Sequence, residues 1–215
     1  MPRVREALAL AKGNPQLIIY DDAEFDGQRS GYDETEYETF IASGDTDFAW
    51  KMPNDEWDAI TINYTSGTTG DPKGVVYHHR GAYLLAQGNA LTASMKKQAV
   101  YLWTLPMFHC NGWCFPWTIS AISGTHVCLR EVRADDIWSA ILEHRVSHMC
   151  GAPIVMSLVV AGKPASAKLV YEVEFFTAAA PPPEAVLAAM KDAGFNVTHL
   201  LSLIHISEPT RQFRI

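Results

Sequence analysis

The sequence predicts an α/β protein in which helices flank a mostly parallel β-sheet, and two observations predict this fold class. From Gly124 onward, short apolar runs alternate with segments of helical spacing, which is the pattern of βαβ units. The 215 residues are 48% hydrophobic and 19% charged, as in an ordinary globular domain with room for one sizeable core.

In the first half of the chain, apolar spacing and turn residues predict the elements. Gly13-Asn14-Pro15 ends a first helix, and Ser43-Gly44 ends a second within the acidic stretch Asp21–Asp58, which we expect to be solvated surface. Gly81 and Gly88 weaken the apolar stripe of the third expected helix. The expected elements are a helix over 3–12, a strand over 17–20, a helix over 35–42, strands over 59–64 and 75–77, a helix over 79–95, a strand over 99–103 and a helical run that ends at 123.

In the second half, helix starts and stops are clearer. Asp135 and Asp136 favour a helix N-terminus, because carboxylates interact well with the positive end of the helix dipole. Pro153 and Pro183 each open a helix, and Gly194 ends the last one. The expected elements are strands over 126–129, 147–150, 172–177 and 196–200 and helices over 135–145, 154–160 and 184–192.

The stretch Tyr64–Gly74 concentrates hydroxyls, glycines and one lysine between two strand-like runs. Glycine lets the backbone come close to a ligand, and successive backbone N–H groups form a concave anion site. Ser and Thr hydroxyls add donors that rotate to suit phosphate oxygens, Lys73 adds a compact positive charge, and Pro72 fixes the turn before it. This chemistry predicts a cradle for a polyphosphate.

Two other interpretations of this stretch can be compared with the sequence, and the first is excluded. It is not a P-loop, because with Gly67 as the first glycine the second glycine of that motif falls on Pro72 and the closing Ser/Thr falls on Gly74. A polar β-hairpin without a ligand remains the alternative, although a hairpin turn needs far fewer hydroxyls than this loop carries.

The run Tyr-Thr-Ser-Gly-Thr-Thr-Gly-Asp-Pro-Lys-Gly-Val, from Tyr64 to Val75, resembles the signature of the adenylate-forming superfamily. This superfamily includes acyl-CoA synthetases, peptide-synthetase adenylation domains and luciferases. The resemblance implies ATP-dependent activation of a carboxylic acid to an acyl-adenylate, transfer to CoA as co-substrate, and Mg²⁺ that bridges the phosphates. The stretch that continues to Tyr83 is most similar to short- and medium-chain fatty acid ligases, including those for methylthiopropionate.

The resemblance also implies which residues hold the nucleotide. Lys73 would neutralise the departing pyrophosphate, and Thr65 would contact the metal. The turn after the strand 172–177 would lie against adenine, because small side chains let a flat base approach the backbone; a simple strand-to-helix turn is the alternative. The implied nucleotide-binding residues are Thr65, Ser66, Gly67, Thr68, Thr69, Gly70, Lys73, Ala179, Ala180 and Pro181.

The acyl pocket is implied by the segment Pro106–Trp113, which follows a buried strand. By resemblance, His109 would lie near the carboxylate and act in catalysis, Trp113 would line the pocket, and Gly151, at the end of another strand, would form its wall. The alternative for His109 is a histidine satisfied by hydrogen bonds in an aromatic core, and the two interpretations are balanced.

The cysteines Cys110, Cys114, Cys128 and Cys150 lie in apolar surroundings of the sequence, and we expect them to be reduced and buried. Each of three histidines stands next to or two residues from a cysteine, but the spacing lacks the two tight pairs of a structural zinc site. Position alone does not support a cysteine nucleophile either.

The resemblance covers a central part of the large AMP-binding domain over residues 1–200 and is clearest over 57–200. Residues 201–215 lack the family's Tyr-Gly-x-Thr-Glu turn, whose Glu helps to hold magnesium, and we interpret them as a sequencing or truncation artefact. The family's ribose-binding aspartate, hinge and small C-terminal domain are also missing. We therefore expect the chain alone to be poorly soluble and inactive.

The expected partner is a small-molecule carboxylic acid, with a fatty acid favoured over an amino acid because no acidic residue stands near the pocket motifs. The net charge of −7 argues against nucleic-acid binding. No signal peptide and no membrane span is evident, so we expect a cytoplasmic enzyme; the oligomeric state stays open. The rival functions are aryl or amino-acid adenylation and a non-catalytic nucleotide-binding remnant.

Overall fold

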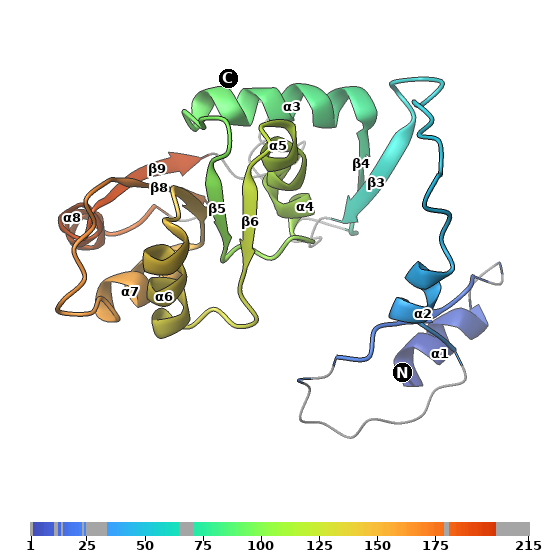
Figure 1. The fold of residues 1–215 in the computed structure, drawn as a ribbon, viewed down its shortest axis with the longest axis horizontal. Coiled ribbons are helices and arrows are strands. Elements are labelled where there is room, and N and C mark those ends of the chain that lie inside the picture. The colour runs from blue at the N-terminus through green and yellow to red at the C-terminus, as the bar shows by residue number, and fades with distance from the viewer. Residues whose placement is uncertain are drawn as a thin grey trace. The chain divides into compact units, whose positions relative to one another are not determined.

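The computed structural model describes residues 2–10, 13, 15–22, 24, 34–64, 71–178 and 181–200 (Figure 1). The chain divides into two compact units, Met1–Met52 and Pro53–Ile215. Each unit is described separately below.

The first unit contains two short helices and a pair of two-residue strands. Its elements are α1 (Pro2–Leu10), β1 (Ile18–Ile19), β2 (Thr35–Glu36) and α2 (Tyr37–Ala42), and β1 pairs with β2 in parallel. The helix predicted over 35–42 begins two residues later, because Glu36 caps it: its carboxylate accepts a hydrogen bond of 3.0 Å from the Thr39 N–H.

The second unit is built on a five-stranded sheet in the order β6-β5-β7-β8-β9, and every neighbouring pair is parallel. This confirms the predicted fold class. The strands are β5 (Val100–Trp103), β6 (Thr125–Cys128), β7 (His148–Cys150), β8 (Val173–Ala178) and β9 (Phe195–Leu200); the helices that follow β6, β7 and β8 are α6 (Ala134–His144), α7 (Pro153–Ala161) and α8 (Glu184–Asp192).

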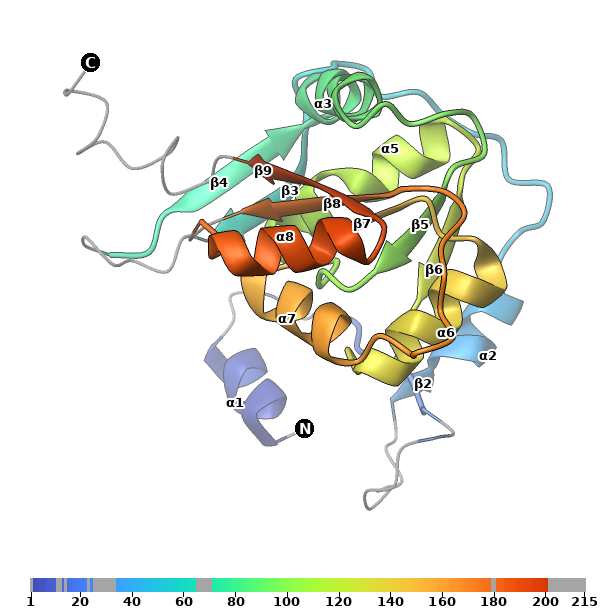
Figure 2. The same ribbon diagram turned by 90° about the vertical axis from the view of Figure 1, so that its left-hand side faces the viewer.

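Helices cover both faces of this sheet (Figure 2). One face packs against α6, α7 and α8 through a large apolar cluster that includes Leu102, Met149 and Phe175. Alternate residues of the same strands, among them Tyr101 and Phe176, form a second cluster with α5 (Phe115–Ala121) on the other face. Burial on both faces explains why these strands read as continuous apolar runs in the sequence.

The predicted strands on either side of the glycine-rich loop form an antiparallel hairpin. They are β3 (Ala59–Tyr64) and β4 (Gly74–His78), and their pairing ends at Tyr64 opposite Gly74. The side chains of Ile62 and Val76, which are opposite one another, are 57% and 53% exposed, so the outer face of the hairpin is apolar and open to water. Helix α3 (His79–Thr92) continues directly from β4.

Two expectations about local structure need correction. Cys128 is exposed and Cys110 is half-buried, because β6 is an edge strand of the sheet and the segment of Cys110 lies near the surface; Cys114 and Cys150 are buried as expected. The four thiols are free. The segment α4 (Cys110–Trp113), which no pattern predicted as a separate element, has a left-handed backbone. None of the described helices is long and apolar enough to cross a bilayer.

His148 makes the stability of this fold depend on pH. Its ring is buried in β7, with Nδ1 2.8 Å from Ser147 Oγ and Nε2 3.0 Å from the Ala93 carbonyl oxygen. Burial lowers the pKa of His148, partly opposed by the bond to Ala93 and the charge of Glu174. The unfolded chain therefore binds more protons than the folded chain between the lowered pKa and the ordinary value of 6.5.

We therefore expect the free energy of unfolding to fall as pH is lowered below about 6.5, and His148→Gln to flatten this dependence. Urea unfolding of the chain at several values between about pH 5 and 7.5 measures it. His199→Gln, at an exposed position of β9, is the matched control and should keep the slope. A slope that persists unchanged in His148→Gln would contradict this account.

Candidate functional site

The carboxyl ends of the parallel strands meet at one edge of the sheet, where α/β proteins bind their ligands. At this edge the Thr104 hydroxyl, just beyond β5, donates to the carbonyl oxygen of Cys150 in β7. The Gly151 N–H donates to the Phe176 carbonyl of β8 at 2.9 Å. These bonds fix the ends of three neighbouring strands, and the predicted pocket segments follow directly from them.

Gly151 lies at this edge as predicted, and its own surroundings require a glycine. A Cβ there would lie 2.9 Å from Val155 Cβ and 3.0 Å from Phe175 Cζ, both within the core. Packing against α7 and β8 thus explains the small residue, and a role as pocket wall stays a prediction.

The segment after β5 contains a complete left-handed turn. Five consecutive residues have positive φ angles: Cys110 (47°), Asn111 (44°), Gly112 (55°), Trp113 (54°) and Cys114 (63°). Left-handed backbone costs about 1–2 kcal/mol for each residue with a Cβ, and such strain concentrates at functional sites. We call this segment the left-handed turn; its four residues with a Cβ store backbone strain.

Gly112 allows the left-handed turn to lie directly on the sheet. A Cβ at this position would come within 2.7 Å of Trp103 Cζ3 and 3.3 Å of the Met107 carbonyl oxygen. The Trp103 indole is itself fixed, because its Nε1 donates to His126 Nδ1 at 2.9 Å and the two rings stack. Burial lowers the pKa of His126, which favours the neutral ring that can accept this bond.

The predicted acyl-pocket residues His109 and Trp113 lie just before this turn and within it. His109 immediately precedes it and is exposed, so it is not the buried core histidine of the alternative interpretation. Phe108 beside it is 81% exposed. Trp113 is half-buried and packs against the aromatic cluster of Tyr101 and Phe115. The segment thus exposes the imidazole of His109 and the phenyl ring of Phe108 to solvent, beside the half-buried indole of Trp113.

The predicted phosphate residues Thr65–Gly70 lie outside the described residues. The structure places Asp71, Pro72 and Lys73 on the surface, immediately before β4. Residues 65–73 join the two hairpin strands, and this connection is longer than hairpin loops of about two to five residues. The hairpin of the ligand-free alternative is present, but its loop exceeds what turn chemistry needs.

The predicted adenine turn is described in part. Ala179 and Ala180 lie outside the described residues, and Pro181 is exposed. Thr177, near the end of β8, was not predicted as a site residue, yet its buried Oγ1 has no hydrogen-bond partner within the described part of the chain. An unsatisfied buried hydroxyl costs about 1–3 kcal/mol, which a ligand or a neighbouring group can recover.

Burial disfavours the thiolate form of the two cysteines in the left-handed turn. Burial raises the pKa of Cys114 to about 11, with a smaller contribution from Cys110, and it also raises the pKa of Cys110. Burial, together with these two cysteines, raises the pKa of Tyr77 in β4 to about 12. Thiolates are the reactive nucleophiles and metal ligands, so the raised pKa values favour a packing role for Cys110 and Cys114. Among the described residues, no three His, Cys, Asp or Glu side chains form a group that could hold a metal ion.

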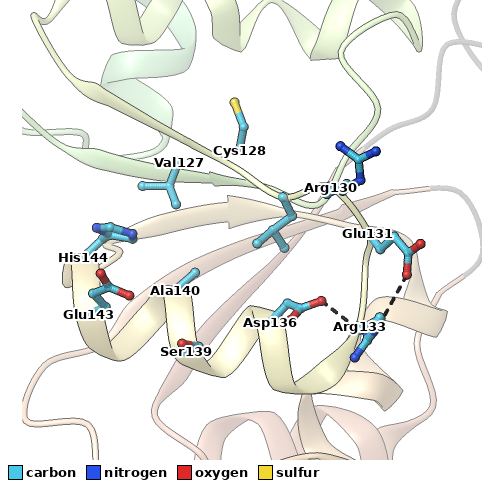
Figure 3. A pocket seen from close by; sticks show the side chains of 11 residues that line it. Val127, Cys128, Arg130, Glu131, Arg133, Asp136, Ser139, Ala140, Glu143 and His144 are labelled. Atoms are coloured by element: carbon cyan, nitrogen blue, oxygen red, sulfur yellow. Dashed lines mark ion pairs between the residues drawn. The ribbon is translucent and has the colours of Figure 1, made fainter. Parts of the chain in front are cut away.

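A surface hollow of about 490 Å³ lies between β6 and α6 (Figure 3). Arg133 crosses one end of it and pairs with Glu131 at 3.7 Å and with Asp136 at 3.4 Å. None of the predicted site residues lines this hollow. Its charges are already paired in part.

Comparison with known proteins gives a consistent set of relatives. A family model described as AMP-binding enzyme matches residues 2–203. An acetate/butyrate–CoA ligase of Arabidopsis thaliana, described as peroxisomal, is 49% identical over 81% of this chain and 31% of its own length. A 2-methylpropanoate–CoA ligase of Humulus lupulus is 43% identical over 91% of this chain and 36% of its own length. The chain thus spans about a third of each of these relatives.

A solved structure has the same fold. The inhibitor-bound N-terminal domain of FACL13 from Mycobacterium tuberculosis superimposes with a TM-score of 0.69 at 28% identity, over 80% of this chain and 44% of that one. The fold described here is thus the fold of part of that N-terminal domain.

The geometry of the left-handed turn predicts how a substitution at Gly112 changes the free energy of unfolding. Gly112→Ala should lower the free energy of unfolding by about 2 kcal/mol or more, because the new Cβ meets the fixed Trp103 ring and occupies left-handed backbone. Gly88→Ala is the matched control: Gly88 lies within α3 with nothing within 4 Å of an added Cβ, so this change should stabilise by about 0.5–1 kcal/mol. Chemical denaturation measures both, and equal effects of the two substitutions would contradict the described geometry.

Proposed function

Because the chain belongs to the family of AMP-binding enzymes, we propose that it is part of an enzyme that activates a small carboxylic acid with ATP and transfers the acyl group to CoA. The observation that carries this proposal is the 49% and 43% identity to two acid–CoA ligases over most of the chain.

The proposed reaction has two steps. A carboxylate oxygen attacks the α-phosphorus of ATP, the bond from that phosphorus to the bridging oxygen breaks, and pyrophosphate leaves. The thiolate of CoA then attacks the acyl carbon, forms the thioester and expels AMP. Both steps move negative charge onto phosphate oxygens, and fixed donors aimed at that charge lower the barriers.

The hairpin suits the first step. Residues 65–70 carry the Ser, Thr and Gly that match the family's phosphate loop, and β3 and β4 hold both ends of the connection. Lys73 lies on the surface at its far end, and we assign it to the charge of the departing pyrophosphate.

The segment after β5 suits the acid. The exposed imidazole of His109 can donate a hydrogen bond to a carboxylate, and Phe108 and Trp113 supply apolar surface around it. The two ligases described above are named for acetate and butyrate and for 2-methylpropanoate. We therefore narrow the expected substrate to short aliphatic acids.

The turn after β8 suits the adenosine part. The small residues at 179 and 180 would allow the base to approach the backbone, with Pro181 closing the turn. The unsatisfied Oγ1 of Thr177, two residues before Ala179, is a polar group in that region that a bound nucleotide or its surroundings can complete.

Magnesium would arrive with the ATP phosphates, whose charge it neutralises. The described residues contain no carboxylate or imidazole cluster that could hold the ion, and the family's glutamate ligand has no counterpart in residues 201–215. The assignment of Thr65 as a metal contact stays a prediction, and no step above depends on the metal.

The cytoplasmic location stays a prediction as well, because one of the two ligases is described as peroxisomal. Peroxisomal and cytoplasmic ligases need the same chemistry at the site, so the compartment does not affect the proposal.

Acid-dependent exchange of pyrophosphate into ATP by the full-length gene product tests the reaction. We expect exchange with acetate, butyrate and 2-methylpropanoate, with kcat/KM at least about tenfold above that for benzoate or for amino acids, because a short apolar pocket discriminates by fit. Exchange with only aryl or amino acids would assign one of the rival adenylating functions. If the protein binds ATP but shows no exchange with any acid, the result would indicate a non-catalytic nucleotide-binding remnant.

Lys73→Ala in the full-length protein should lower kcat/KM for ATP by about 100-fold, because it removes a charge that acts on the leaving group. Lys97→Ala removes an equally exposed lysine from the connection between α3 and β5 and should leave the kinetics unchanged. Steady-state kinetics with ATP as the varied substrate compare the two. Similar values for both variants would remove Lys73 from the proposed phosphate site.

A further inference from the structure

One amide oxygen joins the left-handed turn to the hairpin that carries the phosphate loop. Asn111 Oδ1 accepts a hydrogen bond of 3.0 Å from the Thr61 hydroxyl and one of 2.6 Å from the Asn63 side-chain amide. The three side chains are partly buried, and Asn111 is 50 residues from Thr61 and 48 residues from Asn63 in sequence. Two donors on one strand thus converge on a single acceptor from the turn.

The donors lie on the inner face of β3. Residues two apart in a strand point to the same side, so Thr61 and Asn63 share a face, while Ile62 and Tyr64 point outward and are exposed. Asn63 is separated from Thr65, the first residue of the predicted phosphate loop, by one residue. A bond at Asn63 therefore restrains the strand immediately before that loop.

The same turn is fixed from two other directions. The side-chain amide of Asn89 in α3 donates to the Trp113 carbonyl oxygen at 2.9 Å and lies 3.3 Å from the Thr118 hydroxyl. Gly112 lies against the Trp103 ring. Only the contact through Asn111 reaches the hairpin among the side-chain hydrogen bonds that the described part of the turn makes.

The choice of residue at 111 supports this connection. Asparagine is one of the few residues with a side chain that adopts left-handed backbone readily, and its amide offers a neutral acceptor. The strained backbone and the bond to β3 therefore depend on the same residue. If the bond is lost, the turn loses this side-chain contact with the hairpin, and His109 just before the turn and Trp113 within it can move relative to β3.

We propose that Asn111 is a positioning residue that couples the acid-binding segment to the phosphate loop, so that the carboxylate and the triphosphate are aligned together. The inference rests on the proposed function and extends it to a residue outside the predicted site. Alignment of two reactants contributes strongly to rate, and a displacement of about 1 Å can cost about 100-fold.

Three substitutions in the full-length protein test the coupling. Asn111→Gly keeps a residue suited to left-handed backbone but removes the acceptor, and we expect kcat/KM to fall by about 10- to 100-fold for both the acid and ATP. Asn111→Asp retains an acceptor for both donors and should recover most of that loss. Asn63→Ala should reproduce the loss in part, and combined with Asn111→Gly it should add little, because both remove the same contact.

Asn196→Ala is the matched control. Asn196 donates from its side-chain amide to Glu174 at 2.9 Å near the amino ends of β9 and β8, away from the carboxyl edge, and its loss should leave both kinetic constants unchanged. A purely structural role of Asn111 would lower the melting temperature while kcat/KM for acid and ATP stays as in the unsubstituted protein. That result, or a change confined to the acid alone, would overturn the proposal.

Hydrogen exchange measured by mass spectrometry separates this inference from the proposed function. Asn111→Gly should increase exchange in two segments together, residues 59–64 and residues 107–115, and Asn196→Ala should change neither. If the protein incorporates no pyrophosphate into ATP in the presence of an acid, the proposed function fails. The coupling would still be supported if hydrogen exchange increases in both segments together. Unchanged exchange over 59–64 overturns the coupling whatever the activity.

Discussion

The proposed site depends on a left-handed turn, Cys110–Cys114, that is held against the carboxyl edge of a parallel sheet. The turn is unfavourable on its own, because four of its five residues carry a Cβ. It persists because Gly112 fits over the Trp103 ring and because polar side chains from β3 and α3 bind it. The surrounding fold thus determines the position of His109 and Trp113, and the sheet supplies the rigid base.

This arrangement connects elements that are far apart in the chain. The hairpin β3–β4 precedes the sheet in sequence and pairs with none of its strands, so it needs side-chain contacts to be placed. Asn111 supplies one, and α3, which continues from β4, supplies another through Asn89. A substrate site built between a hairpin and a sheet edge gains precision from such contacts, because loops alone are poorly fixed.

The sheet and most helices could be predicted from the sequence because their signals are local. Strands buried on both faces read as apolar runs, and Pro153 and Pro183 mark helix starts, so the predicted helix 184–192 matches α8 in both bounds. Cys128 was predicted wrongly, because apolar neighbours in sequence do not reveal that β6 is an edge strand. The left-handed turn and the role of Asn111 were missed because they depend on partners from other elements, which for Asn111 are 48 and 50 residues away. The Asn111-Gly112 pair, typical of left-handed turns, was the available signal.

The most direct test of this account is a crystal structure of the full-length protein with a non-hydrolysable ATP analogue. The account predicts phosphate oxygens within hydrogen-bonding distance of backbone N–H groups of residues 65–70 and of Lys73, with Asn111 Oδ1 still bound to Thr61 and Asn63. A loop whose amides are all paired with main-chain carbonyls, with the nucleotide bound elsewhere, would contradict it.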